Sequence, residues 1–449
     1  MNLPVQFLER MKNMLGNDYQ KFMDSYDKPH IQSLRLNPLK EVDFLTSDML
    51  SPVEWAKNAY YYSSEKQFGK YIYHNMGLYY IQEASAMFPA EVLDVKENET
   101  ILDLCAAPGG KSTQIATLMN NTGLLISNEI ISKRANILKD NISRLGITNT
   151  VVLNEDSETI SKYFNDYFDK ILVDAPCSGE GMFRKNPEAI SEWSLDNVNM
   201  CAERQLQILN NIKNCLKENG ILVYSTCTFS PQENEQVIEK FLQENNDFEL
   251  LDIPYNQFKN GIIPNTKTNF KDIEKTRRIF PHINNGEGHY VAKLRKKVSS
   301  YNGYNDIKLQ KTSINNKTLK LFKEFEKVKL NKEYKGTFIQ FGDNIYLLPS
   351  NTPSLNKLKV VYSGLLLGSV INNRFEPSYE LALSLKKEEV KECIELSETE
   401  AYKYIHGETI TTNSNASGWI LLTYKNNPIS WGKVNNGTIK NHYPKYLRT

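Results

Sequence analysis

Two cysteine residues stand where a thiol could do covalent chemistry. Cys177 lies in VDAPCSGEGMF and Cys227 in VYSTCTFSPQENE, and each follows an apolar run that predicts a buried strand. Upstream, ILDLCAAPGGKSTQIATLM predicts a strand, a loop of small residues and a helix. Small residues at such a turn let a ligand approach the backbone closely. The sequence therefore predicts two thiols beside a cofactor site.

Two thiols next to a methyl donor would suit methylation of a pyrimidine at C5. Cytosine C5 is a poor nucleophile until a thiolate adds to C6 and makes the ring resemble an enamine. Afterwards the C5 proton and the sulfur must leave, so a second group that assists removal of the proton is needed. The alternative is that a cysteine is a small buried apolar residue. We adopt that interpretation for the thiols outside the pair, Cys105, Cys201, Cys215 and Cys393.

The elements expected to carry these residues alternate between strand and helix from about residue 98. The strands read ETILDLC, GLLISNE, TVVLNED, KILVDAP and GILVYSTC, and the helices include KRANILKDNISRL and ERQLQILNNIKNCL. Such a pattern predicts an α/β fold with a doubly wound, mostly parallel sheet that is covered on both faces. In that fold the fourth strand lies between the first and the fifth, about 4.8 Å from each. Asp174, Cys177 and Cys227 should therefore meet beside the cofactor.

Three acids follow successive strands, at the edge of the sheet where ligands bind. Glu129 stands 19 residues after Gly110, where an acid binds ribose hydroxyls in nucleoside-binding folds. Asp156 is a candidate for the adenine edge, and Asp174 ends the fourth strand. Each acid could instead be a helix cap or a turn residue. Free N–H groups at the helix start attract anions such as a carboxylate; Lys111 could meet that carboxylate or be a solvated lysine of the first turn.

Composition is typical of a globular protein with several domains. The 449 residues are too many for one core, and 40% hydrophobic and 24% charged residues are ordinary values. We find no signal peptide and no apolar run near the ~18 residues of a membrane span, so a cytoplasmic protein with reduced thiols is expected. Six cysteines and six histidines show no ligand spacing, so neither a metal site nor a disulfide framework is expected.

The C-terminal third carries an excess of positive charge. Residues 298–449 hold 21 Lys and Arg against 14 Asp and Glu, although the whole chain has a net charge of +1. After the last acid, Glu408, basic residues alternate with rings: Lys425, Lys433, Lys440, Lys445 and Arg448 with Trp419, Tyr424, Trp431, Tyr443 and Tyr446. Basic groups and stacking rings suit RNA with exposed bases. The alternative is a small β domain with these rings in its core and a solvated basic rim. Hairpins are expected at NNP and NNG.

These motifs resemble the Sun-type RNA cytosine-5 methyltransferases, and among them the bacterial RsmF/YebU-like branch for 16S rRNA. The similarity covers nearly the whole chain and is carried by RLNPLK (35–40), YYIQEASAM (79–87), DLCAAPGGK (103–111), DAPCSGEGMFRK (174–185), YSTCTFSPQENE (224–235), GEGHYVAKL and WGKVNNGTIKNHYPKYLR. The resemblance implies a Rossmann-like class I methyltransferase fold that uses S-adenosylmethionine. We expect five parts: an N-terminal accessory α+β domain (1–95), the methyltransferase domain (96–297), a linker (298–316), an intermediate module (317–385) and a PUA-like RNA-binding module (386–449).

The resemblance also implies roles for single residues. Cys227 matches the nucleophile that attacks C6, and Cys177 matches the second cysteine, which helps to resolve the covalent intermediate. The methyl-donor contacts match Cys105, Ala106, Ala107, Pro108, Gly109, Gly110, Lys111, Glu129, Asp156 and Asp174. Asp174 could also bind the cytosine amino group or N3, because it lies between cofactor and base. RNA contacts are expected at Arg184, Lys185, Lys433, Lys440 and Lys445, although Arg184 and Lys185 could equally be an exposed basic pair.

The expected activity is methylation of cytidine C5 in RNA. The PUA-like tail favours small-subunit rRNA, free or in the assembled subunit, as the partner, with no membrane and no obligate protein partner. The alternatives are a tRNA cytosine-5 methyltransferase and a ribosome-assembly factor that binds RNA without catalysis. A DNA cytosine-5 methyltransferase would place its nucleophile in the Pro-Cys loop, whereas here a second thiol lies in STCT.

Overall fold

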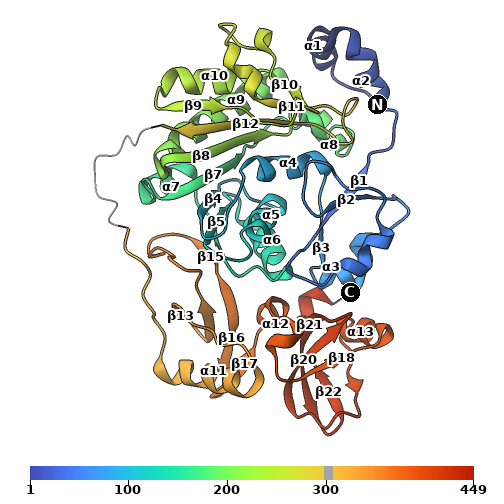
Figure 1. Cartoon of the computed structure of the whole chain (residues 1–449), viewed down its shortest axis with the longest axis vertical. Coiled ribbons are helices and arrows are strands. Elements are labelled where there is room, and N and C mark those ends of the chain that lie inside the picture. Colours follow the sequence, from blue (N-terminus) through green and yellow to red (C-terminus); the bar gives the residue numbers. More distant parts are fainter. Residues whose placement is uncertain (298–306, 449) are drawn as a thin grey trace.

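The computed structural model describes residues 1–297 and 307–448 (Figure 1). Its centre is one large sheet built from β4 (Thr100–Asp103), β5 (Leu124–Asn128), β6 (Thr150–Leu153), β7 (Phe168–Asp174), β8 (Leu216–Thr226), β9 (Phe248–Leu251), β10 (Lys259–Asn260), β11 (Arg277–Ile279), β12 (His289–Lys296) and β15 (Val360–Ser363). The strand order is β10-β11-β12-β8-β7-β4-β5-β6-β15, with β9 beside β12. The five strands from β4 to β8 run parallel, and β12 and β15 close the parallel part with antiparallel pairings. The predicted doubly wound sheet is confirmed, with the fourth strand, β7, between β4 and β8.

Helices cover both faces of this sheet, because alternate strand residues point to opposite sides. Ile101 of β4 belongs to one core, together with residues of α4 (Ala84–Val92), α5 (Gly110–Leu118) and α6 (Ser132–Arg144). Leu102 belongs to the other, together with residues of α7 (Ser157–Tyr163), α9 (Leu195–Ile212) and α10 (Glu235–Glu244). Apolar side chains on both sides of each strand explain why the strands read as continuous apolar runs.

The N-terminal part packs against the loops that carry the two cysteines. Its elements are α1 (Val5–Leu15), α2 (Tyr19–Ser25), β1 (Gln32–Leu36), β2 (Ala59–Tyr62), α3 (Ile72–Asn75) and β3 (Tyr79–Ile81), and the three strands form an antiparallel sheet in the order β2-β1-β3. The first helix, α1, buries Phe7 and Met11 against Phe183, Trp193 and Phe229. The last three residues belong to the loops that follow β7 and β8, next to α8 (Pro187–Glu192).

Two small sheets make up the C-terminal part. The elements are α11 (Asn316–Lys329), β13 (Phe338–Phe341), β14 (Asn344–Leu347), β16 (Leu365–Ile371), β17 (Arg374–Pro377), α12 (Tyr379–Ser384), β18 (Cys393–Glu395), α13 (Glu398–Ile405), β19 (Ile410–Thr411), β20 (Gly418–Tyr424), β21 (Asn427–Asn435) and β22 (Thr438–Asn441). The strand orders are β13-β14-β16-β17 and β18-β20-β21-β22-β19. Both predicted hairpins form, because the turn residues Lys425–Asn426 and Asn436–Gly437 have the positive φ that two-residue hairpins need.

The edge strand β15 belongs to the intermediate module. Gly364 follows it and turns the chain with φ +78°, and a Cβ there would lie 2.7 Å from the carbonyl oxygen of Leu347. The chain is thereby split between β15, which pairs with β6 of the central sheet, and β16 of the small sheet. The intermediate module consequently extends the central sheet.

The five-part division of the chain stays our proposal. Within the expected linker, residues 298–306 lie outside the described residues, and Leu309 and Ser313 form bridges with Pro353 and Ile339. One apolar core joins the two C-terminal modules, and a second joins the last module to the N-terminal sheet. None of the helices within the described residues has the length and apolar character needed to cross a membrane.

Candidate active site

The two cysteines meet at the carboxyl ends of neighbouring parallel strands. Cys227 directly follows β8, and Cys177 lies three residues beyond β7; the register pairs Asp174 with Ser225. The two sulfur atoms are 3.3 Å apart, and both residues are partly buried. The hydrogen bond to Cys227 and burial raise the pKa of Cys177 well above the ordinary range of a thiol. Cys177 therefore keeps its proton at neutral pH and can donate it as a hydrogen bond to the sulfur of Cys227.

Asp174 is the charged centre of the same pocket. Its carboxylate accepts from Lys111 Nζ at 2.7 Å and from Ser225 Oγ at 2.7 Å, and His289 Nε2 lies 3.6 Å away. Burial alone would raise the pKa of Asp174, but Lys111 and His289 outweigh it and hold the pKa below the ordinary range. Lys111 is buried in this ion pair, so it is not the solvated lysine that the sequence left open. A contact between Lys111 and the carboxylate of a ligand stays a proposal.

The small-residue loop lies between β4 and α5, as predicted. Arg134 donates to the carbonyl of Ala107 and Asn141 to that of Pro108, which fixes the loop from α6. Gly109 has φ +116°, a conformation that favours glycine. None of the described side chains caps the first N–H groups of α5, so those groups are available as donors for an anion.

Asp103, which the sequence analysis did not single out, lies under this loop at the end of β4. One carboxylate oxygen accepts from Ser112 Oγ at 2.6 Å, and Oδ1 is buried without a hydrogen-bond partner among the described residues. Burial raises the pKa of Asp103 to about 7. A ligand with a positively charged ammonium group would satisfy Oδ1, and its carboxylate would fit the start of α5. An aspartate inside the apolar run TILDLC was the available signal in the sequence.

The other two predicted acids lie at the same edge of the sheet with different surroundings. Glu129 is buried, accepts from the N–H of Ile131 at 2.9 Å and lies 3.3 Å from Arg134. Asp156 is exposed and caps α7 by accepting from the N–H of Thr159 at 2.7 Å. Asp156 thus has the capping role that the sequence left open, and its contact with adenine remains a proposal.

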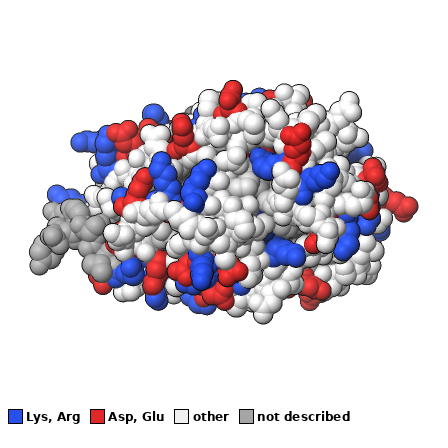
Figure 2. All heavy atoms as spheres, turned by 90° about the horizontal axis from the view of Figure 1, so that it is seen from above, with Lys and Arg blue, Asp and Glu red and all other residues white. Residues whose placement is uncertain are grey.

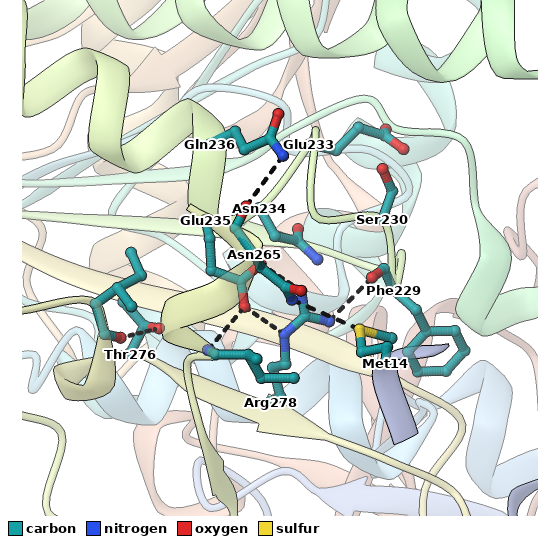
Figure 3. A network of polar contacts seen from close by, with 12 residues as sticks. Met14, Phe229, Ser230, Glu233, Asn234, Glu235, Gln236, Asn265, Thr276 and Arg278 are labelled. Carbon is teal, nitrogen blue, oxygen red and sulfur yellow. Dashed lines mark hydrogen bonds and ion pairs between the residues drawn. The ribbon is translucent and has the colours of Figure 1, made fainter. Parts of the chain in front are cut away.

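Buried ion pairs hold the loop that carries Cys227 (Figure 3). Arg278 of β11 donates to both carboxylate oxygens of Glu235 and, through Nη1, to the carbonyl of Phe229 at 3.0 Å. Both side chains of the pair are at most 1% exposed. Cys227 stands two residues before Phe229, so this pair fixes the chain just after the thiol.

Two further glutamates connect the cysteine loops to each other. Glu233 accepts from the N–H of Ser178 at 2.8 Å and from its hydroxyl at 2.5 Å, and burial raises the pKa of Glu233 to about 7. Glu180 accepts from the N–H of Phe229 at 3.2 Å and pairs with Arg10 of α1. The supporting roles of Glu233 and Glu180 were not predicted from the sequence, although the acids in PQENE, shortly after a cysteine, were a signal for such a role.

Arg184 and Lys185, expected to contact RNA, lie in different surroundings. Arg184 is partly buried, with its side chain 9% exposed, and forms a two-pronged ion pair with Glu287, at 2.7 and 3.0 Å; it also donates to the carbonyl of Ser25. This guanidinium supports the fold, and the arrangement does not favour the phosphate contact expected of it. Lys185 is exposed, and its RNA contact stays a prediction.

The basic residues of the tail surround a ring-filled core. Lys440 and Lys445 are exposed, and Lys433 is partly exposed with its Nζ 5.1 Å from the ring centre of Trp419. Of the five rings, Trp419, Tyr424, Trp431 and Tyr443 are buried and only Tyr446 is largely exposed, at 70%. The alternative of core rings with a basic rim is therefore correct for four rings.

The opposite end of the molecule, which carries α1 and α2, has a mixed surface. Figure 2 shows basic side chains intermixed with acidic ones on this face.

Comparisons with known proteins agree along the whole chain. Residues 90–295 match the family model of 16S rRNA methyltransferase RsmB/F, and residues 3–84, 324–385 and 391–449 match the N-terminal, first C-terminal and PUA domains of RsmF. The ribosomal RNA small subunit methyltransferase F of Vibrio cholerae (strain M66-2) is 31% identical over 469 aligned residues, covering 100% of this chain and 98% of that relative. The enzyme of that name from Shewanella frigidimarina is 34% identical, covering 88% and 84%.

Solved structures share the methyltransferase part. A methyltransferase homologue from Pyrococcus horikoshii is 33% identical with a TM-score of 0.58, covering 65% of this chain and 94% of that one. NSun6 from Pyrococcus horikoshii, solved with SFG, is 22% identical with a TM-score of 0.57, covering 66% and 98%, and shows the fold alone.

Proposed function

Because this chain belongs to the RsmF family of 16S rRNA methyltransferases, we propose that it methylates C5 of cytidine in small-subunit rRNA through a covalent adduct with Cys227. S-adenosylmethionine is the methyl donor of this fold and family, and RNA is the substrate class. The observation that supports the C5 chemistry best is the 3.3 Å between the sulfur atoms of Cys177 and Cys227. We assign the reaction to the cytoplasm, with 16S rRNA or the assembled small subunit as the substrate.

Cys227 begins the reaction as a thiolate. Its sulfur forms a bond to C6, the C5–C6 double bond opens, and the electron pair gives C5 nucleophilic character. Lys111 carries its charge in the same buried pocket, where a cation favours the thiolate form of a cysteine. S-adenosylmethionine, when bound, supplies the methyl group that C5 accepts.

Cys177 assists the release of the product. After methylation the C5 proton passes to a solvent water molecule, which can reach this partly exposed site. The electron pair of the C5–H bond restores the C5–C6 double bond, and the bond from C6 to the Cys227 sulfur breaks. The departing sulfur becomes a thiolate in a partly buried site, where it needs a hydrogen-bond donor. Cys177 holds its proton because its pKa is raised, and its sulfur lies within contact of that thiolate.

The residues around β4 fit the methyl donor. The uncapped N–H groups at the start of α5 suit its carboxylate, and the free Oδ1 of Asp103 suits its ammonium group. Glu129 at the end of β5 is buried beside the loop, as an acid that binds ribose hydroxyls would be. Because the thiols are partly buried, the target base must leave its stack to reach them.

The test is a denaturing gel of protein mixed with labelled 16S rRNA and S-adenosylmethionine. The Cys177→Ala protein is expected to form a band that survives denaturation, because the adduct forms but is not resolved. The band should be absent when Cys227→Ala is added to the same protein. Cys393→Ala is the matched control, since Cys393 lies on β18 of the C-terminal sheet, and it should turn over like wild type.

Three results separate the alternatives. An adduct that persists without Cys227 would show that Cys227 is not the nucleophile. Wild-type protein that transfers methyl groups to tRNA and not to 16S rRNA would make it a tRNA enzyme. Binding of both RNA and methyl donor without any transfer, to free rRNA or to assembled subunits, would support a non-catalytic assembly factor.

A further inference from the structure

A second cavity, away from the thiols, lies where the N-terminal part, α6 and the C-terminal tail meet. Its volume is about 340 Å³, and its lining includes Asn75, Arg144, Tyr379, Tyr443, Tyr446 and Arg448. Places where parts of a chain meet are common positions for ligand sites. Helix α6 begins at the carboxyl edge of the central sheet, and its 13 residues span about 20 Å toward the opposite edge, where Arg144 ends it. The cavity is therefore separate from the thiol pocket.

Two guanidinium groups line this cavity, and neither has a carboxylate partner among the described residues. Arg144 donates to the carbonyl oxygen of His74 at 2.7 Å and to an amide oxygen at 3.0 Å. Arg448 donates to an amide oxygen and a carbonyl oxygen of the tail, both at 3.2 Å, and its Nε is buried without a hydrogen-bond partner in the described part of the chain. Asp140 is the one acid among the lining residues, and it pairs with Lys139 at 3.3 Å. Two cations with neutral partners favour an anionic ligand, because charge-assisted hydrogen bonds would satisfy both.

Tyrosine rings form another part of the wall. Tyr379 and Tyr443 pack edge to face, with ring centres 5.5 Å apart, and the hydroxyl of Tyr379 donates to the carbonyl of Asn75 at 3.0 Å. Tyr446 also lines the cavity but is 70% exposed, so its ring lies at the mouth. An exposed ring beside a guanidinium suits a nucleotide, whose base stacks on the ring while its phosphate meets the cation.

Resting on RNA as the substrate of the proposed function, we propose that this cavity binds one unstacked nucleotide of the rRNA at a distance from the target cytidine. The base stacks on Tyr446, and the phosphate on one side of it pairs with Arg448. Lys445 is exposed directly before Tyr446 and can meet the next phosphate along the strand. The contact anchors the RNA where the three parts of the protein meet, and it tolerates any base because every base has a face that can stack.

The test measures affinity for 16S rRNA by filter binding over a range of salt concentrations. All proteins carry Cys227→Ala, so that no adduct contributes to binding. The variants are Tyr446→Ala, which removes the ring, Tyr446→Trp, which keeps one, and Arg448→Gln, which removes the charge. The matched control is Phe341→Ala, since Phe341 on β13 is an exposed ring, at 55%, outside the lining of this cavity. Binding of S-adenosylmethionine should be equal in all of them.

Tyr446→Ala should weaken rRNA binding about fivefold or more without changing its salt dependence, whereas Tyr446→Trp should stay within about twofold of the parent protein. Arg448→Gln should flatten the dependence on the logarithm of salt concentration by about one unit. If Tyr446→Ala bound rRNA as well as Phe341→Ala does, or if Tyr446→Trp bound as poorly as Tyr446→Ala, the proposal would be overturned. Calorimetric binding of free cytidine 5′-monophosphate that depends on Tyr446, with rRNA affinity unchanged, would overturn it in favour of a free-nucleotide site. Failure of the proposed function is a separate result, because these affinities are measured without methyl transfer.

Discussion

Removing the charge of Arg278 should loosen the chain that carries Cys227. Arg278→Met leaves the Glu235 carboxylate buried, and among the described residues its one remaining donor is the N–H of Ile262, at 3.2 Å; the carbonyl of Phe229 loses the donor Arg278. Methionine fills a similar volume, so the change isolates the lost charge and hydrogen bonds. Because Phe229 lies two residues after the nucleophile, the same change should slow adduct formation.

The expected cost is about 3–5 kcal/mol, the usual loss when one partner of a buried ion pair is removed. The two side chains are 1% and 0% exposed, so little solvent screening reduces that figure. Adding Glu235→Gln to Arg278→Met removes the unpaired charge and keeps an acceptor for Ile262. The double variant should therefore lie within about 1–2 kcal/mol of wild type, which gives a large coupling energy between the two sites.

Amide hydrogen exchange in β8 and α10 measures this locally, because a chain with several modules does not unfold in one step. The control is Arg295→Met, since Arg295 pairs with Glu249 on the surface with 44% and 37% exposure and should cost less than about 1 kcal/mol. If Arg278→Met cost no more than Arg295→Met, or if the double variant were as unstable as the single one, the argument that this pair supports the nucleophile would be refuted.

Three further predictions concern the donor site, the close packing of the loops and the tail. Asp103 has a pKa of about 7 in the folded protein against an ordinary value near 4. The free energy of unfolding should therefore fall by on the order of 4 kcal/mol as the pH rises from about 4 to 8. Asp103→Asn should raise the thermal midpoint of the ligand-free protein at pH 8 and not at pH 4, while weakening calorimetric binding of S-adenosylmethionine; equal midpoint shifts at both pH values would contradict this. Gly181→Ala places a Cβ within 2.9 Å of two carbonyl oxygens, and it should lower the rate of adduct formation at least tenfold without changing donor affinity, as followed on denaturing gels. Lys440→Gln and Lys445→Gln should each weaken rRNA binding and flatten its dependence on the logarithm of salt concentration by about one unit in filter-binding assays, and an unchanged slope would exclude a phosphate contact.

The sequence was sufficient for the five parallel strands β4 to β8, because each of them is largely buried on both sides. It did not identify β9, β10, β11 or the pairing of β15 with β6. Ile101 and Leu102 belong to opposite cores, as expected for a sheet that is covered on both faces. The meeting of Cys177 and Cys227 then follows from strand order alone, since strands four and five are neighbours in a doubly wound sheet.

The sequence could not predict features that depend on which surface covers a residue. From its place in the sequence, Arg184 was expected to contact RNA. In the structure it pairs with Glu287, which lies 103 residues further along the chain. Trp431 alternates with lysines as a stacking ring would, yet it lies in a core shared with Phe325 of the preceding module. This sharing also makes deletion of the tail a poor test of RNA binding, because it would expose apolar cores, and single charge substitutions are preferable.

The short distance between the thiols is maintained by the loops and does not depend on the strands alone. Glu233 of the Cys227 loop accepts twice from Ser178, Glu180 of the Cys177 loop accepts from Phe229, and the N–H of Gly181 donates to the carbonyl of Cys227 at 2.9 Å. Each loop therefore supplies donors to the other, and the two thiols must move together. Since Glu180 is also the partner of Arg10, the N-terminal helix is attached to this joined unit and not to either thiol separately. An RNA that displaced the helix would shift both sulfur atoms relative to the methyl donor and leave their mutual distance unchanged.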